Sequence, residues 1–246
     1  MINLDSLLAL LAIPKENASL FSLRHSKKAK RLIFKHSIRN GFEIVLPLFY
    51  DDNWVLETVT TNKPKIENRL IEIKEARTEL KPTTIRLPLL GISWKVIYRE
   101  TNEKDLNAIT ETQTTLEVSE KTEDTFWTST VLQQWLHAKA LVYLPKHLDD
   151  VSAKLKLPYN NVRIKRQKTL WGSCSSKGNI NLNRNLMLMP SEVVDYVLHH
   201  EIVHLKVLSH SSKFWKELER SFPDYKKSIK QLKYFVGNKI PEWALV

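Results

Sequence analysis

The sequence predicts an α+β protein in which a β-rich first half precedes a mostly helical second half. Strand-like runs dominate residues 1–122, with one helical excursion, whereas helical periodicity dominates residues 123–246. A polar stretch, SEKTED at 119–124, separates the two patterns, so we place a domain boundary near residue 122. A chain of 246 residues is long enough for two modest domains.

Strands in the first half are marked by alternating apolar and branched residues. Strand patterns occur at 20–26, 30–38, 42–49, 83–91, 92–100 and 114–120. Arg39-Asn40-Gly41 joins the second and third of these runs, and Asn-Gly favours a tight hairpin turn. Residues 51–59 and 66–80 are expected to be helical, because Leu70 and Ile73 recur at helical spacing in the longer stretch.

The second half begins with a long helical run at 126–157, in which Pro145 should cause a kink or a restart. Short strands are expected at 161–166 and 179–183, on either side of KTLWGSCSSKG. Three helices should close the chain at about 191–208, 211–221 and 224–235, with starts at Pro190-Ser191 and Pro223-Asp224.

The cysteine content and the apolar segments indicate the cellular compartment in which the protein is expected. The single cysteine, Cys174, excludes an internal disulfide framework and fits a reducing cytoplasm. No segment approaches the roughly eighteen consecutive apolar residues of a membrane span, so no membrane partner is expected. LLALLAI (7–13) is short and follows Asp5 instead of a basic segment, which argues against a secretory signal.

The net charge of +11 is unevenly distributed along the chain. Residues 131–246 carry 19 Lys and Arg against 9 Asp and Glu, a net of +10, and residues 1–130 carry 19 against 18. A basic half can attract nucleic acid, acidic substrates or anionic lipid, or it can be a solvated surface without a partner. No helix-turn-helix, Cys/His finger or RNA-recognition signature accompanies it, so nucleic acid is only one candidate partner.

Half of the eight histidines lie in one stretch, HHEIVHLKVLSH at 199–210. On a helical wheel with about 100° per residue, His200, Glu201 and His204 fall on the apolar side, with residues such as Leu208. His199 falls on the opposite side and is expected to be solvated. Because histidines at i and i+4 lie one turn apart on one face, His200 and His204 can bind one Zn²⁺ ion.

Glu201 completes the pattern H-E-x-x-H. Its offset from the two histidines places it to reach a water at the metal instead of the ion itself, which assigns it as a catalytic base. The alternative is a chance match in which the histidines are hydrogen-bonded core residues. An inward-facing carboxylate and two imidazoles need partners, because unpaired buried polar groups cost about 1–3 kcal/mol each, and this favours the metal.

A catalytic zinc ion takes three protein ligands, and His210 is the favoured third. The chain must turn at 206–209 to bring its side chain back toward the other two histidines. SHSS (209–212) resembles a helix start, where the helix dipole favours a neutral, metal-binding imidazole. A carboxylate from the following helices, Glu217, Glu219 or Asp224, remains the alternative ligand.

The order of several motifs resembles the YgjP-like zinc metallopeptidase domain family, which is related to SprT- and WLM-type zincin-like proteases. The motifs that carry it are WGSC (171–174), NLN (181–183), Pro190, VVDYVLHHEIVHL (193–205), HSSKFW (210–215) and PDY (223–225), with SLRHSKKAKRL (22–32) similar but less specific. The resemblance implies a zincin-like fold for residues 123–246. It also implies one Zn²⁺ per chain held by His200, His204 and His210, and Glu201 as the base. Ser209 departs from an asparagine common in the family, which should affect a turn and not the metal.

Two function classes follow. The first is a zinc-dependent metallopeptidase that hydrolyses a protein or peptide substrate through Glu201. The second is a DNA-associated binding module with a mainly structural zinc ion, or a protease recruited by DNA, since SprT-type relatives act on DNA-bound proteins. The basic second half is compatible with either class.

Five further residues are candidates for substrate binding. Trp171 and Gly172 should shape the wall of a cleft, and Tyr225 either donates a hydrogen bond to an oxyanion or packs. Asn181 and Asn183 lie on NINLN, which is expected either to be an edge strand that pairs with an extended peptide or to be an ordinary strand. Ser173 and Cys174 are not assigned as nucleophiles, because no Gly-x-Ser-x-Gly elbow surrounds them.

Overall fold

The computed structural model describes residues 2–245 except 101–107, 121–125, 168 and 239. Its helices and sheets confirm the α+β class, and the chain divides into two compact units between Leu80 and Lys81. The boundary expected near residue 122 falls within 121–125, which lies outside the described residues. The observed division comes earlier because residues 81–100 and 108–120 pack with the second unit.

The N-terminal unit contains a three-stranded sheet and two helices, whereas the sequence indicated a single helical region. Its elements are α1 (Leu4–Leu11), a 3₁₀ turn η1 (Lys15–Leu20), β1 (Phe21–Ser26), β2 (Ile33–Ser37), β3 (Gly41–Pro47) and α2 (Asp52–Thr78). The strand order is β1-β3-β2, with β1 parallel and β2 antiparallel to β3. The predicted hairpin is confirmed. Its Gly41 has φ +71°, and a Cβ there would lie 2.1 Å from the Leu20 carbonyl oxygen.

Both helices of this unit bury apolar residues in its core. The short leucine run folds as α1, which buries Leu7 and Leu11. The two predicted helical stretches form one helix, α2, which continues through Pro64. Its buried side chains recur at helical spacing and include the predicted Leu70 and Ile73.

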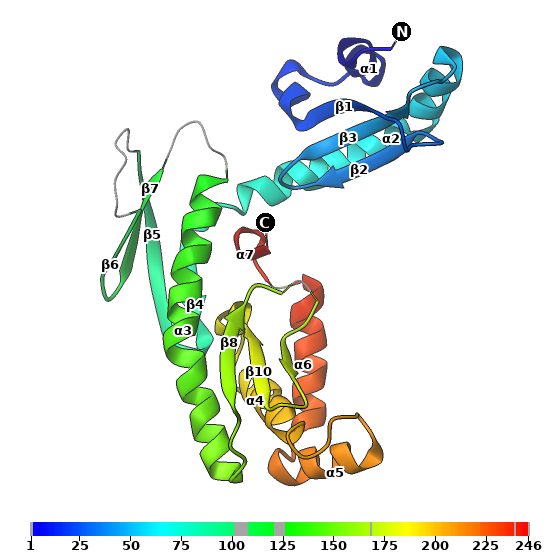
Figure 1. Ribbon diagram of the computed structural model, residues 1–246. Coiled ribbons are helices and arrows are strands. Elements are labelled where there is room, and N and C mark those ends of the chain that lie inside the picture. The colour runs from blue at the N-terminus through cyan, green and yellow to red at the C-terminus, as the bar shows by residue number, and fades with distance from the viewer. Residues whose placement is uncertain (1, 101–107, 121–125, 168, 239, 246) are drawn as a thin grey trace. The chain divides into compact units, whose positions relative to one another are not determined.

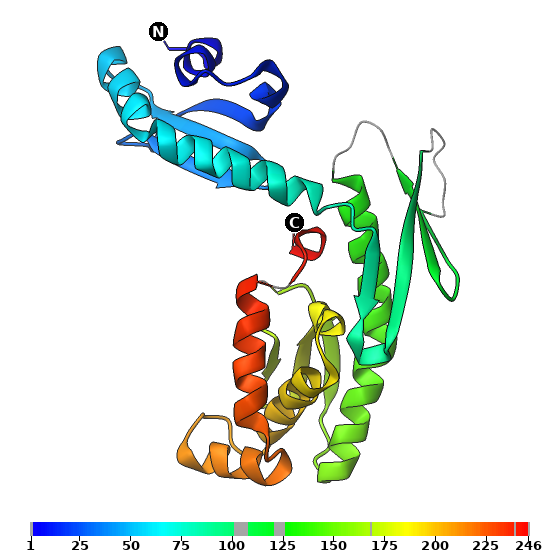
Figure 2. The ribbon, with the colours of Figure 1, turned by 180° about the vertical axis from the view of Figure 1, so that it is seen from behind.

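The second unit contains a four-stranded sheet and the long helix α3 (Trp127–Leu155). The strands are β4 (Thr84–Leu87), β5 (Ile92–Glu100), β6 (Ile109–Glu111) and β7 (Thr115–Glu120), in the order β4-β5-β7-β6, and the turn η2 (Pro88–Leu90) follows β4. Figures 1 and 2 show α3 running along this sheet, and the β4 end of the sheet also contacts Arg184–Leu188 and Ser191–Val203 farther along the chain. The helix continues through Pro145, so of the two predicted alternatives, a kink or a restart, the restart is wrong.

A second sheet consists of β8 (Asn161–Lys165), β9 (Gly172–Cys174) and β10 (Asn179–Asn183). The order is β8-β10-β9, so β10 lies in the centre, parallel to β8 and antiparallel to β9. Of the two alternatives for NINLN, the edge strand is therefore wrong and the ordinary strand is confirmed. The segment before it, for which no strand was predicted, supplies β9 as an edge.

In the described part of the chain, four helices follow the second sheet and its 3₁₀ turn η3 (Arg184–Leu188). They are α4 (Ser191–Val203), α5 (Ser212–Ser221), α6 (Tyr225–Asn238) and α7 (Glu242–Leu245). The first ends at Val203, before the predicted residue 208, so His204 is its C-cap and Leu208 is exposed. The short α7 was not predicted, and its Trp243 is fully buried. None of the described helices is long and apolar enough to cross a membrane.

Candidate metal centre

Three histidine side chains converge at the end of α4. His200 lies in the last turn, His204 caps the helix, and the chain then turns so that His210 returns just before α5. The Nε2 atom of His200 lies 3.2 Å from Nε2 of His204 and 2.9 Å from Nε2 of His210. The three residues form a group whose ligand atoms lie within 4.8 Å of one another.

This spacing fits a metal ion. Two imidazole nitrogens on a tetrahedral zinc ion lie about 3.4 Å apart, given metal–nitrogen bonds of about 2.0–2.1 Å. The pKa of His200 is lowered to about 3, first by burial and then by the two neighbouring imidazoles, and burial also lowers the pKa of His204. Both rings are therefore neutral, which is the form that binds a metal.

Groups behind the cluster contact two of the three histidine rings. The Nδ1–H of His204 donates to the backbone carbonyl of Val207 at 3.0 Å, which leaves its Nε2 lone pair free. The Nδ1 atom of His200 lies 3.4 Å from the hydroxyl of Tyr196, one turn earlier on α4. Neither contact was predicted. Tyr196 could have been found from its i−4 spacing, whereas a backbone carbonyl leaves no signal in a sequence.

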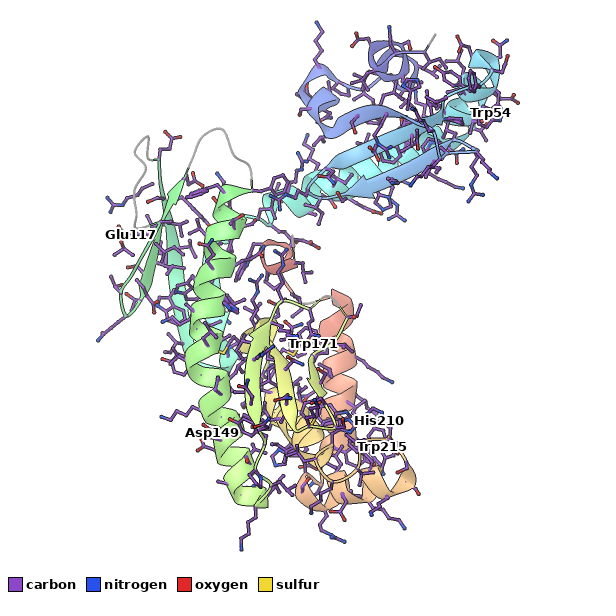
Figure 3. All side chains as sticks on the ribbon, viewed as in Figure 1. Trp54, Glu117, Asp149, Trp171, His210 and Trp215 are labelled. Carbon is purple, nitrogen blue, oxygen red and sulfur yellow. The ribbon has the colours of Figure 1, made fainter. Side chains whose placement is uncertain are left out.

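Aromatic side chains from α5 and α6 pack around the cluster. The fully buried ring of Phe214 lies 4.5–4.9 Å from the ring centroids of all three histidines. Trp215 stacks on His210 at 5.9 Å, and on its other neighbour, Tyr225, at 5.7 Å. Figure 3 shows Trp215 beside His210. Tyr225 is buried within this stack.

Glu201 lies beside the histidines in a closely packed place. It is only 4% exposed, and its Oε2 atom has no hydrogen-bond partner among the described residues. Burial raises its pKa to about 8. Strand β9 covers it so closely that a Cβ on Gly172 would lie 2.5 Å from Glu201 Oε1. Burial and the Glu201 charge also raise the pKa of Cys174 to about 11, so this thiol is not an activated nucleophile.

The prediction that His199 is solvated is wrong. The residue is 4% exposed, its Nδ1–H donates to the Asp195 carbonyl at 2.8 Å, and its ring packs 5.1 Å from that of Phe222. A helical wheel assigns one side of α4 to solvent. Here the chain after α5 also covers that side, so the helix is buried on both.

The asparagines of β10 bond within the fold. Asn183 is 2% exposed; its amide donates to the carbonyls of Gln167 and Leu170 at 2.8 and 2.9 Å, and its oxygen accepts from the Asn185 backbone. It therefore holds the loop before β9. Asn181 donates across the sheet to the hydroxyl of Ser173 at 3.0 Å.

Trp171 is partly buried and lies directly before β9. Its ring packs against the core of the second unit.

An α+β unit with three convergent imidazoles beside a buried carboxylate has the side chains of a metal-dependent hydrolase. The family model of the YgjP-like metallopeptidase domain matches residues 30–235. The chain therefore belongs to the YgjP-like metallopeptidase domain family, and a metallopeptidase of this family uses a divalent metal, typically zinc.

One solved structure is also similar. The metallopeptidase zymogen of Pyrococcus abyssi abylysin shares 30% sequence identity, over 37% of this chain and 92% of that one, with a TM-score of 0.34. No curated protein matches the chain at a comparable level.

Proposed function

We propose that this chain is a zinc-dependent peptidase in which His200, His204 and His210 hold one zinc ion and Glu201 is the catalytic base. The convergence of three Nε2 atoms next to a buried carboxylate carries the proposal. Membership of a metallopeptidase family supports it.

The chemistry divides between the metal and Glu201. When bound, zinc supplies a Lewis acid that makes water more acidic and polarises a carbonyl group. The positive charge of the bound ion would favour the ionised form of the buried Glu201. Its carboxylate would then remove a proton from the attacking water and deliver it to the leaving amine nitrogen. The packing of Gly172 against this side chain holds the carboxylate in one place for both transfers.

The exposure of the ligands favours a catalytic over a structural ion. His204 is buried but His210 is exposed, so one side of the cluster opens to solvent. Catalytic zinc sites keep an open position, whereas structural ones are closed by four protein ligands. No observation favours the alternative of a DNA-associated module with a structural zinc ion, in which Glu201 would have no role.

We place the substrate along β9 instead of β10. Of the two edge strands in this sheet, β9 is the one whose Gly172 contacts Glu201. An extended peptide can pair with an exposed strand edge through backbone hydrogen bonds alone, and this suits cleavage within a chain. The substrate's carbonyl would then pass near the three histidines.

Substituting Glu201→Gln tests the proposal. The variant should keep its zinc, measured by elemental analysis, and lose about 10²–10⁴-fold in cleavage rate on an unstructured protein such as casein. His200→Ala should lose both metal and activity, and His36→Ala, at an exposed position of the N-terminal unit, should lose neither. Wild-type activity in Glu201→Gln would exclude Glu201 as the base. Salt-sensitive DNA binding without cleavage of any protein would favour the alternative.

A further inference from the structure

We propose that one end of the N-terminal unit is a docking surface for anionic phospholipid membranes. The expectation of no membrane partner rested only on the lack of a spanning segment, and a docking surface needs none. The surface, called the basic-apolar tip below, comprises Lys27, Lys28, Lys30, Arg31, Leu48, Phe49 and Trp54. It lies in a different compact unit from the histidine cluster, and the proposal does not depend on the peptidase function.

The strand arrangement brings two loops to this end. Strands β1 and β3 are parallel, and their last residues, Ser26 and Pro47, are partners in the register. The loops at 27–32 and 48–51 therefore leave the sheet at the same edge. Helix α2 also begins here, and Figure 3 shows Trp54 at this end of the unit.

The first loop is strongly basic. Lys27, Lys28, Lys30 and Arg31 are all exposed, and none forms an ion pair with another described residue. The nearby Arg24 is already paired with Glu43 at 2.7 Å. Because Asp51 and Asp52 add only two carboxylates, the tip has a net positive charge.

The second loop exposes apolar side chains. Phe49 is 92% exposed and Leu48 46%, and Trp54 on the first turn of α2 is 40% exposed. Consecutive large apolar residues in water on a loop are unusual without a partner. They lie beside the basic loop, so a complementary surface must be both anionic and able to accept apolar groups.

The two loops are held in place. The hydroxyl of Tyr50 lies 3.4 Å from Nε2 of His25, and the two rings stack at 5.9 Å, which ties the end of β3 to the end of β1. Asp51 accepts from the backbone of Trp54 at 2.8 Å and so fixes the first turn of α2. Binding therefore requires little new order in the tip.

An anionic bilayer has the matching chemistry. Lysine and arginine side chains are attracted to anionic headgroups, tryptophan favours the interface, and leucine and phenylalanine insert at the boundary with the acyl chains. A single-stranded nucleic acid is also anionic and stacks on aromatic rings. Leu48 is aliphatic and cannot stack on a base, so the combination of basic, aromatic and aliphatic side chains favours lipid.

The test is co-sedimentation of the full chain with vesicles of phosphatidylcholine, with or without phosphatidylserine. The chain should bind the anionic vesicles at least about tenfold more strongly. Phe49→Ser should weaken binding, and so should the pair Lys27→Glu and Lys28→Glu. Each should leave the thermal unfolding temperature unchanged, because all three side chains are exposed.

Two matched controls lie farther along α2. Ile71→Ser removes a side chain that is 56% exposed, and the pair Lys65→Glu and Lys74→Glu makes the same change of charge, so neither should affect binding. If the control variants lose vesicle binding as strongly as the tip variants, binding depends on the general charge and apolarity of the protein and not on the tip. That result would overturn the proposal. Absence of vesicle binding would also overturn it, and so would binding of a random single-stranded oligonucleotide through the tip in its place.

Discussion

Gly172 on β9 lies against the carboxylate of Glu201 on α4, and the fit leaves no room for a side chain. A Cβ on residue 172 would lie 2.5 Å from Oε1, 2.7 Å from Cγ and 2.8 Å from Cδ of Glu201. Strand β9 and helix α4 therefore hold the Glu201 side chain closely between them. Glu201 directly follows His200, the first histidine of the cluster.

Gly172→Ala should consequently displace Glu201 without removing a metal ligand. We expect kcat/KM for peptide cleavage to fall by about 10²-fold, because a catalytic group displaced by about 1 Å loses its productive geometry. Bound zinc should stay at the wild-type level. Loss of zinc together with activity would show that residue 172 supports the ligands instead of the base.

Gly91→Ala is the control for this substitution. No atom lies within 4 Å of the position that a Cβ would take at residue 91, so the added methyl group displaces no neighbour. Because Gly91 has φ +66°, the alanine should lower the free energy of unfolding somewhat. Cleavage of the peptide by the folded variant should nevertheless equal that of the wild type.

Tyr196 supplies a second test, through the metal affinity. Its hydroxyl lies 3.4 Å from Nδ1 of His200, and it is the only side-chain contact described for that nitrogen. Removing such an outer contact typically costs 10–100-fold in metal affinity, so Tyr196→Phe should bind zinc about tenfold more weakly in a chelator competition. Tyr159→Phe loses a hydroxyl contact with Asp149 elsewhere in the same unit and should leave zinc affinity unchanged. Equal affinities in wild type and Tyr196→Phe would contradict an orienting role.

Local sequence patterns predicted the convergence of the three histidines better than their surroundings. His200 and His204 follow from helical spacing alone, and His210 required only a turn after the helix. The central place of β10 depends on pairing between segments distant in the chain, which local alternation does not encode. The burial of His199 depends likewise on Phe222, which the fold brings back over α4. Pairing and covering are tertiary effects, so a pattern confined to one element misses them.

The C-terminal helix α7 should contribute strongly to the stability of the second unit. Trp243 is 1% exposed, and its backbone carbonyl accepts from Nε2 of Gln133 on α3 at 2.8 Å. Arg184 on η3, itself 6% exposed, also donates to Gln133. The Gln133 side chain therefore joins α3, α7 and η3. Trp243→Ala should lower the free energy of unfolding by about 3–5 kcal/mol in urea titration. Leu245→Ala, at a side chain 44% exposed, should cost less than about 1 kcal/mol.

A last prediction concerns pH and the contact between α3 and α4. Nε2 of His147 lies 2.5 Å from Oδ1 of Asp195, and this hydrogen bond is the largest cause of the raised pKa of His147. Because the folded pKa lies above the unfolded value of about 6.5, the pair stabilises the fold fully below about pH 6.5. The stabilisation disappears as the pH rises through the folded pKa. Both side chains are 34% exposed, so solvent limits the effect to less than about 1 kcal/mol.

Asp195→Asn should therefore destabilise the protein more at about pH 5.5 than at about pH 8.5 in urea titrations. The neighbouring His199 also titrates, and burial lowers its pKa, so the single variant does not isolate the pair. A double-mutant cycle with His147→Gln removes that contribution, because His199 is present in all four proteins. The coupling energy should be favourable at the lower pH and near zero at the higher one. A coupling energy that is equal at both pH values would mean that the contact between His147 and Asp195 does not depend on the protonation of His147.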